Sequence, residues 1–391
     1  MHIAPDLHLG YCTNIHRGED WAQTFQSLQT YTRAVRERVC PRKPFGIGLR
    51  LSALAARELS EPAALVVFRR WLDGQNSYVF TINGFPYGKF HGTRVKEQVY
   101  APDWTTSERV VFTKQLFEIL AQLLPEGGEG SVSTLPGSFK EFITTPEQVK
   151  VMRANLWECI DYIAELSRRT GRRLHLGLEP EPLCYLETTQ EVVAFFEQMR
   201  TERPGDEHLH KHLGVNYDTC HMAVEFEEPA EAVQRLVRNG VKLSKVHLSS
   251  ALKVRPGAEV RKALTRFLDD VYLHQVVERR VDGTLRRFRD LDLALQESSD
   301  RGPEGVEWRI HFHVPLHSRP DALFDNTSEH IEGLLNQLHT HPDLCRHLEM
   351  ETYTWEVLPE GLKNRDVVEQ LVCEYDWTLK RLAEHGNIRA S

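Results

Sequence analysis

Two patterns of apolar residues alternate along this chain. Short runs that are mostly apolar and end in polar residues are typical of buried parallel strands. Longer segments, such as 19–39, repeat apolar residues every three or four positions, which predicts amphipathic helices. We predict eight strands, at residues 7–15, 45–51, 77–83, 131–135, 174–179, 213–217, 242–249 and 348–353.

Helix-start signals follow several of these strands. The sequences at 105–108 (Thr-Thr-Ser-Glu), 145–148 (Thr-Pro-Glu-Gln) and 188–191 (Thr-Thr-Gln-Glu) each place a capping threonine three residues before Gln or Glu. Eight strand-then-helix units follow one another without a break in composition or a flexible linker. The sequence therefore predicts one closed (β/α)8 barrel, a TIM barrel, over residues 1–391.

One segment is too long for this scheme. Residues 251–326 separate strand seven from its helix, far more than an ordinary connection in a barrel. Within the segment, 275–281 and 284–291 flank Asp282-Gly283, a strong hairpin signal, and 308–316 form a further β-type run. We expect an insertion over the barrel mouth that serves as a lid or as a contact in a homo-oligomer.

Composition limits where the protein works. No stretch of about 18 apolar residues exists, so no membrane insertion is expected. The first residues, Met1 to Asp6, lack the basic and apolar regions of a secretory signal. The seven cysteines are scattered and form no CxxC pair, which favours reduced thiols and a cytoplasmic location.

Net charge limits the class of partner. The formal charge of -8 disfavours a nucleic-acid partner, because phosphates favour a basic surface. We expect a small-molecule substrate instead.

Polar side chains stand at the ends of four consecutive strands. Strand five ends in Glu179, directly before Pro180, and strand six is followed by Asp218. Strand seven carries His247 and strand eight carries Glu351. Because the carboxyl ends of barrel strands meet at one mouth, we expect these four side chains to converge. Carboxylate and imidazole ligands together suit Mn²⁺, Zn²⁺, Mg²⁺ or Co²⁺, and the sequence leaves the identity of the ion open.

Further histidines lie where they could reach the same mouth. His221 follows Asp218 by three residues, and His91 follows strand three. His311 and His313 alternate in the β-type run of the long insertion. These four histidines are candidates for a second metal or for substrate contacts.

The order of these residues resembles a known superfamily. Glu179, the Asp218-x-x-His221 string, His247 and Glu351 on strands five to eight are similar to the xylose-isomerase-like barrels, which include sugar isomerases, epimerases and the endonucleases of abasic-site repair. A closer resemblance, over most of the chain, is to the metabolite traffic protein EboE family. The stretches 8–18, 46–52 and 78–94 and the string RIHFHVPL carry it.

The superfamily's epimerases imply a role for each residue. Positions matching Glu179, Asp218, His247 and Glu351 bind one metal there, and the two glutamates exchange a proton with the carbon next to a carbonyl. His221 would hold a substrate oxygen. The resemblance implies a divalent-metal-dependent isomerase or epimerase that acts on a small polyhydroxylated or phosphorylated metabolite, in a pathway of specialised-metabolite biosynthesis or traffic.

Two other functions stay open. The repair endonucleases bind up to three zinc ions, so a two-metal phosphoesterase that uses His91, His221 and His313 is one alternative. The acidic chain and the histidine pair in place of Asp-x-His disfavour DNA repair itself. The second alternative is a non-catalytic metabolite carrier or scaffold, which would not need the two acid/base glutamates.

Other polar residues receive a structural interpretation. We interpret Glu225 as part of a solvated helix start, Glu181 and Glu187 as loop charges, and Cys220 as a packing residue. Lys96, near the mouth, is a candidate for holding a phosphate or carboxylate group of the substrate.

Overall fold

The computed structural model describes residues 1–4, 6–88, 96–299, 305–317, 323–354 and 366–388. Eight parallel strands close into a barrel, because the last of them pairs with the first, which in turn pairs with the second. The predicted (β/α)8 barrel is confirmed. Its strands are β2 (Leu7–Cys12), β3 (Phe45–Arg50), β4 (Ser77–Asn83), β5 (Glu129–Thr134), β6 (Arg173–Leu178), β7 (Leu213–Asp218), β8 (Lys242–Leu248) and β14 (His347–Met350), and β1 (His2–Ala4) adds an antiparallel edge to β2.

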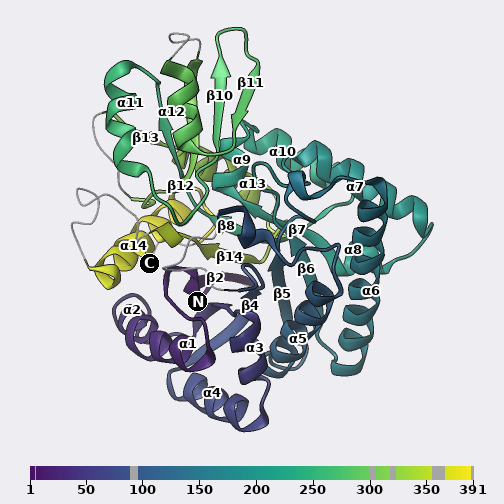
Figure 1. The fold of residues 1–391 in the computed structure, drawn as a ribbon. Helices are drawn as coiled ribbons and strands as arrows, with labels where there is room; N and C mark the ends of the chain where they lie inside the picture. The colour runs from purple at the N-terminus through teal and green to yellow at the C-terminus, as the bar shows by residue number, and fades with distance from the viewer. Residues whose placement is uncertain (5, 89–95, 300–304, 318–322, 355–365, 389–391) are drawn as a thin grey trace.

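Helices surround this barrel (Figure 1). Two of the three predicted capping boxes are present, at Thr145 before α6 and at Thr188 before α7. The one predicted at 105–108 is wrong, because α5 begins after Thr106, whose side chain makes no capping hydrogen bond. The helices of the barrel part are α1 (Trp21–Ser27), α2 (Arg33–Val39), α3 (Ala53–Leu59), α4 (Pro62–Gly74), α5 (Ser107–Leu123), α6 (Pro146–Thr170), α7 (Thr189–Glu202), α8 (His208–His212), α9 (Thr219–Val224), α10 (Pro229–Arg238), α13 (Ser328–Thr340) and α14 (Val367–Glu384).

A second sheet lies between β8 and α13 in the chain. Its five strands run in the order β11-β10-β12-β9-β13, and they are joined by antiparallel pairs. They are accompanied by α11 (Ala258–Leu264) and α12 (Leu291–Ser299), grouped at the top of Figure 1. The strands are β9 (Ala251–Val254), β10 (Val276–Arg280), β11 (Leu285–Phe288), β12 (Gly305–His313) and β13 (Asp325–Asn326). The assignment of 251–326 as an insertion into one domain stays a prediction.

Alternation along β12 gives this strand two different faces. Trp308, Ile310 and Phe312 are buried in an apolar cluster that belongs to the second sheet and its helices. Because successive side chains of a strand point to opposite faces, His311 and His313 point the other way. Both histidines are buried, and β12 contacts α9, the short helix that follows β7. The second sheet thus adds two imidazoles to the end of the barrel where β7 terminates.

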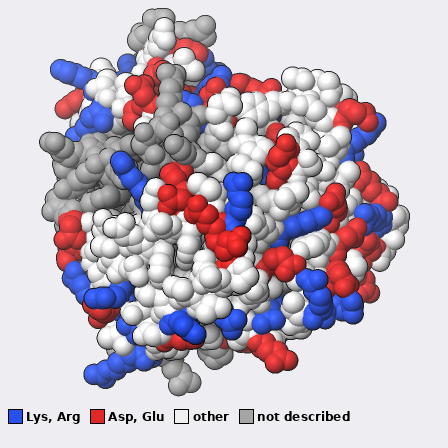
Figure 2. Space-filling model, turned by 60° about the horizontal axis from the view of Figure 1, so that its bottom comes forward, with Lys and Arg blue, Asp and Glu red and all other residues white. Residues whose placement is uncertain are grey.

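The helices, surface charges and cysteines of the described residues have three further features. No helix among the described residues is long and apolar enough to cross a membrane. Lys and Arg lie among Asp and Glu on the face shown in Figure 2. No disulfide joins any of the seven cysteines, and all but Cys373 are buried.

Candidate metal centre and active site

Four neighbouring strands bring the predicted ligands together. Asp218 is the last residue of β7 and pairs in register with His247 of β8. Glu179 directly follows β6, where its backbone N–H donates to the carbonyl of Thr134. Glu351 directly follows β14, where its N–H donates to the carbonyl of Leu248. One donor atom from each of Glu179, Asp218, His247 and Glu351 lies within 4.8 Å of the other three.

The four side chains are arranged around one nitrogen atom. Nδ1 of His247 lies 2.9 Å from Glu179 Oε1, 3.2 Å from Glu351 Oε2 and 3.6 Å from Asp218 Oδ2. All four residues are buried. A single nitrogen can offer a hydrogen to at most one or two of these oxygens, so the set holds more negative charge than the imidazole alone can balance.

A second carboxylate fixes the orientation of this imidazole. Nε2 of His247 lies 3.1 Å from Glu349 Oε2, at the opposite end of the ring from the three carboxylates. Ionised Glu349 is an acceptor only, so Nε2 carries the hydrogen and donates it. In the neutral ring Nδ1 then carries a lone pair that faces the other carboxylates. A carboxylate behind a histidine in this way is the usual support of a metal-binding imidazole.

Glu349 is itself held by a buried polar network. Its carboxylate accepts from Lys245 Nζ at 2.9 Å and from Asn83 Nδ2 at 2.9 Å. Lys245 also donates to the side-chain oxygen of Asn83 and to Ser133 Oγ. Gly48 makes room for this network, because a Cβ at that position would lie 1.7 Å from Glu349 Oε1. The network anchors His247 from inside the barrel.

Asp218 offers an oxygen that no protein group satisfies. Its Oδ1 accepts from Ser249 Oγ at 2.7 Å and from the backbone N–H of His221 at 2.9 Å. Its Oδ2 is buried, has no hydrogen-bond partner in the structure and points toward His247. Buried acceptors without a partner are costly and rare. A divalent cation fits this unpartnered oxygen together with the lone pair of His247.

The charges of the centre move the pKa values of its members. Burial would raise the pKa of Asp218, but His221, His247 and His313 hold it well below its usual range. Burial would lower the pKa of His247, but Glu351, Glu179 and Asp218 raise it well above its ordinary value. The centre therefore favours ionised carboxylates next to positive charge, which is the condition that a bound cation meets.

A cavity of about 60 Å³ adjoins the four residues. Glu179 and Glu351 form part of its wall, together with Asn14, which donates to Glu351 Oε1 at 2.6 Å. Most of the remaining wall is apolar or aromatic. That part consists of Phe85, Pro86, Val99, Tyr100, Leu135, Tyr272, Leu273 and Tyr353.

Comparison with solved structures shows which proteins share this fold. A xylose isomerase-like TIM barrel protein from Mycobacterium smegmatis in complex with magnesium matches 98% of this chain and 99% of its own, with a TM-score of 0.54 and 12% identity. This chain has the xylose-isomerase-like barrel fold. No family model and no curated protein matches the sequence.

Two further structures share the xylose-isomerase-like barrel. An L-ribulose 3-epimerase covers 97% of this chain and 96% of its own, with a TM-score of 0.51 and 12% identity. A D-tagatose 3-epimerase-like protein covers 96% and 98%, with a TM-score of 0.50 and 12% identity. At this level of identity the likeness shows the fold alone.

A second group of histidines lies beside the first set of ligands. His221 donates from Nδ1 to the carbonyl of Pro180 at 3.1 Å, and its Nε2 lies 3.0 Å from His311 Nε2. One donor atom each from Asp218, His221 and His313 lies within 4.8 Å of the other two. The predicted convergence of His221, His311 and His313 is therefore observed, whereas His91 falls outside the described residues.

Three residues interpreted as solvated or loop charges are buried, so that interpretation is wrong. Glu181 lines the cavity, accepts from Tyr100 Oη at 2.5 Å and lies near His221 and His311. Burial raises the pKa of Glu181 to about 7 against the opposing effect of His221. Glu187 and Glu225 are buried as well, where they pair with basic residues that the sequence does not place beside them, Lys140 for Glu187 and Arg287 for Glu225.

Lys96 lines the cavity, and its ammonium group has partners within the protein. Its ammonium group pairs with Asp290 Oδ2 at 2.6 Å and donates to the carbonyl of Tyr272 at 2.8 Å. These contacts tie the segment after β4 to the part of the chain that forms the second sheet. Asp290 balances the charge of Lys96, and a contact between Lys96 and a substrate phosphate or carboxylate stays a prediction.

The sequence interpretation gave no role to Glu349, Lys245 or Asn83. A signal for two of them was present, since Glu349 shares a strand face with Glu351 and Lys245 shares one with His247. Following the same strand face one step into the barrel would have indicated the polar network behind the candidate ligands of this xylose-isomerase-like barrel.

Proposed function

We propose that this protein is a divalent-metal-dependent isomerase or epimerase that acts on a small metabolite. Glu179, Asp218, His247 and Glu351 would hold the ion. The observation that carries the proposal is the convergence of three buried carboxylates on Nδ1 of His247, whose other nitrogen is fixed by Glu349.

Glu179 and Glu351 are the acid/base pair in this proposal. They follow β6 and β14, the two outer strands of the arc β6-β7-β8-β14, so they approach the cavity from different sides. One carboxylate removes a proton from the carbon next to a carbonyl, and the other returns a proton from its own side. Asn14 positions Glu351 by donating to Oε1, which leaves Oε2 toward the centre. When bound, the ion supplies Lewis-acid polarisation of substrate oxygens.

A narrower family placement supports a role in metabolism. We assign the chain to the metabolite traffic protein EboE family on the stretches 8–18, 46–52 and 78–94 and on the string RIHFHVPL. Two of its structural neighbours are described as a sugar epimerase and an epimerase-like protein. A pathway that makes or moves a specialised metabolite accords with both.

The cavity wall limits the substrate. The carboxylates, Asn14 and Asn83 belong to it, and they suit the hydroxyl groups of a polyhydroxylated substrate. Phe85, Leu273 and Tyr353 stand among the mainly apolar remainder. A substrate with adjacent oxygens at one end and an apolar part at the other fits this wall better than a free sugar does.

Metal analysis tests the first step. We expect about one divalent ion per chain that depends on Asp218 and His247, lost on dialysis against a chelator and restored by Mn²⁺ or Zn²⁺. Asp206→Asn is the matched control, because Asp206 belongs to an exposed acidic group with Asp161 and His208. A content well below one that added ions do not restore would refute the centre.

Solvent exchange tests the reaction without knowledge of the product. The protein is incubated in D₂O with a panel of ketoses, keto-acids and their phosphates, and deuterium at the carbon next to the carbonyl is measured by mass spectrometry. Glu351→Gln should abolish incorporation while metal-free stability is retained. Glu278→Gln, a change at a buried glutamate on β10, is the control. Ligand binding without incorporation in the unmodified protein would instead support the carrier alternative.

A second candidate function is favoured by one observation. Asp218 Oδ2 and His313 Nε2 are both buried without a partner, and both belong to residues of one donor group with His221. A two-metal phosphoesterase would use such a neighbouring site. Release of phosphate from phosphomonoesters that requires two ions per chain would support it over the isomerase.

A further inference from the structure

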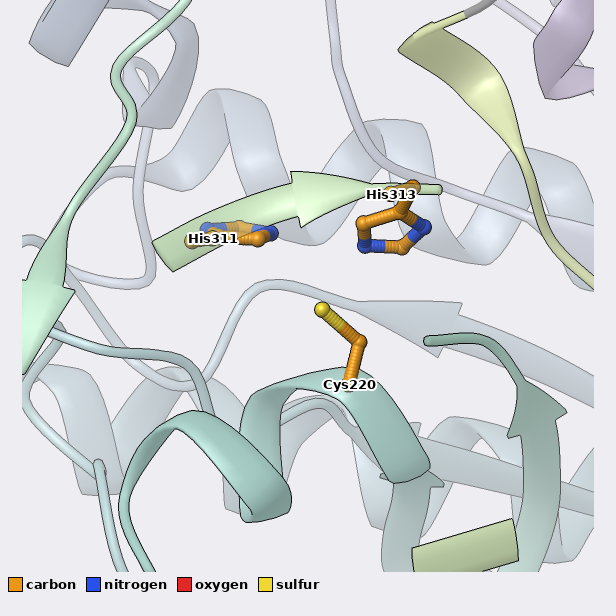
Figure 3. A group of neighbouring side chains, drawn as sticks. All are labelled: Cys220, His311 and His313. Atoms are coloured by element: carbon orange, nitrogen blue, oxygen red, sulfur yellow. The ribbon is translucent and has the colours of Figure 1, made fainter. Parts of the chain in front are cut away.

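A thiol lies between the two imidazoles that β12 contributes. Figure 3 shows the side chain of Cys220, from α9, directed toward the space between His311 and His313. One donor atom from each of these three residues lies within 4.8 Å of the other two. All three are buried.

The hydrogen-bond partners of His311 define its tautomer. Its Nδ1 lies 2.8 Å from Gln275 Oε1. The amide nitrogen of Gln275 donates to the carbonyl of Pro182 and to Tyr100 Oη, which fixes the amide oxygen toward His311. An amide oxygen only accepts, so Nδ1 carries the hydrogen and Nε2 carries a lone pair.

His313 is held in the same way. Its Nδ1 lies 3.1 Å from the backbone carbonyl of Glu351 and must donate to it. Its Nε2 therefore carries a lone pair, and this buried atom has no hydrogen-bond partner. Both imidazoles are thus oriented by a hydrogen bond from Nδ1, which is how histidine ligands of metals are supported in proteins. Nε2 of His313 is unpartnered, whereas Nε2 of His311 lies 3.0 Å from His221 Nε2 and 3.3 Å from Tyr353 Oη and would exchange these contacts for an ion.

We propose that Cys220, His311 and His313 bind a second, thiolate-ligated ion of the zinc type. A cysteine with two histidines is a soft ligand set that prefers Zn²⁺ to Mg²⁺ or Mn²⁺. Ligand atoms on one tetrahedral zinc lie roughly 3.3–3.8 Å apart, so side-chain movements of about 1 Å complete the site. Three protein ligands leave a fourth position open for water or a substrate atom.

This site goes beyond the proposed isomerase and does not depend on it. The first group, which consists of His247 and its three neighbouring carboxylates, contains one imidazole. The second group contains two imidazoles and a thiol and no carboxylate. Two sites of different ligand chemistry at one mouth would hold two different ions. Two contacts link the groups directly in the described residues: His221 lies next to Asp218 and His311, and Nδ1 of His313 donates to the backbone carbonyl of Glu351.

The alternative is that Cys220 serves packing alone. It belongs to a small apolar cluster with Val224, Ala251 and Val277, between α9 and the second sheet. Packing explains why the residue is small and buried, but it does not explain the unpartnered Nε2 of His313 beside it.

Cobalt binding separates the two. Metal-free, reduced protein is titrated with Co²⁺, and the near-ultraviolet absorption of thiolate-to-cobalt charge transfer is recorded. We expect this band to saturate at about one thiolate-bound ion per chain and to be displaced by Zn²⁺. Cys220→Ser and His313→Gln should each abolish the band. Cys345→Ser, which changes another buried thiol, should retain it.

Each result bears on one site. Glu351→Gln should weaken the first ion and leave the band intact, so a failed isomerase proposal and a failed zinc proposal give different outcomes. Absence of the band in unmodified protein, or its persistence in Cys220→Ser, overturns the second site. A third outcome is that the protein binds two ions without showing the band and that His221→Asn loses the second ion. This outcome would assign the second ion to Asp218, His221 and His313, and it would also overturn the proposed Cys220 site. If Cys220→Ser fails to fold, His313→Gln decides.

Discussion

Nε2 of His247 donates to Glu349 across 3.1 Å, and this single contact decides which nitrogen the ring presents to the mouth. When the ring is neutral, as metal binding requires, its one hydrogen stays on Nε2 toward Glu349, and Nδ1 faces Glu179, Asp218 and Glu351 as a lone-pair donor. The orientation of the His247 ring is thus set inside the barrel by Glu349, which lies two residues before Glu351 in the chain.

Glu349→Gln should weaken metal binding although Glu349 is not a ligand. An amide can offer its own N–H to Nε2 of His247, so the ring loses its fixed tautomer and part of its basicity. We expect affinity for Mn²⁺ or Zn²⁺ to fall about 10–100-fold, the usual effect of such a change. Isothermal titration of metal-free protein measures it. An affinity equal to that of the unmodified protein would contradict the assigned role of Glu349.

Gly48→Ala should damage the centre from the neighbouring strand. The new Cβ would lie 1.7 Å from Glu349 Oε1, so the carboxylate must leave Lys245 and His247. We expect both a lower melting temperature in excess chelator and a lower metal affinity. Gly74→Ala, at the end of α4 where nothing lies within 4 Å of the new atom, should change neither property adversely.

Lys245→Met should destabilise the metal-free barrel strongly. It leaves Glu349 as a buried carboxylate without its cation, and removal of one partner of a buried pair costs about 3–5 kcal/mol. Urea unfolding in excess chelator measures this. The double variant Lys245→Met/Glu349→Gln should recover much of the loss, and a double variant as unstable as the single one would contradict the explanation. Arg168→Met, which breaks an exposed pair with Glu165, should have little effect.

Glu374 should make stability depend on pH. Burial raises its pKa to about 7, against hydrogen bonds from Thr352, Gln370 and Leu316. Because the pKa is higher in the folded than in the unfolded chain, the folded state binds the proton more tightly. This group therefore lowers stability as pH rises from about 4.5 to 7, and above pH 7 the cost reaches about 3 kcal/mol.

Glu374→Gln removes this dependence. The variant should match the unmodified protein near pH 4.5 and exceed it in unfolding free energy at pH 8. Urea unfolding at both pH values checks the difference, and equal curves at pH 8 would show that the carboxyl group is not raised in pKa.

The sequence predicted the fold and the convergence of Glu179, Asp218, His247 and Glu351 for the same reason. Parallel strands with buried faces end in polar residues at one mouth, so the position of Glu179 or Glu351 in its strand already indicates where the side chain lies. The residues around them depend on distances across the barrel. Nothing in the order of residues shows that Lys245 reaches both Asn83 and Glu349, or that Gly48 leaves the space for them.

The second group of donors depends on the path of a long segment. Alternation in β12 separates His311 from Phe312, but only the packing of the second sheet decides which of the two meets α9. Glu181 illustrates the same limit, because its place between two prolines gives no sign of Tyr100, which lies 2.5 Å away. The sequence therefore indicates which side chains could donate to a metal or a substrate, but tertiary packing decides which groups they contact.

The position of β14 has a consequence for the order in which this protein is made. Glu351 directly follows the strand that joins β8 to β2 and so completes the ring. During synthesis Glu179, Asp218 and His247 leave the ribosome first. More than a hundred residues must follow His247 before Glu351, the fourth proposed ligand, is made. A nascent chain that lacks β14 has neither a closed barrel nor a full ligand set. The proposed first ion would therefore bind tightly only to a finished barrel, and its binding would favour the closed ring over chains in which the last strand has come loose.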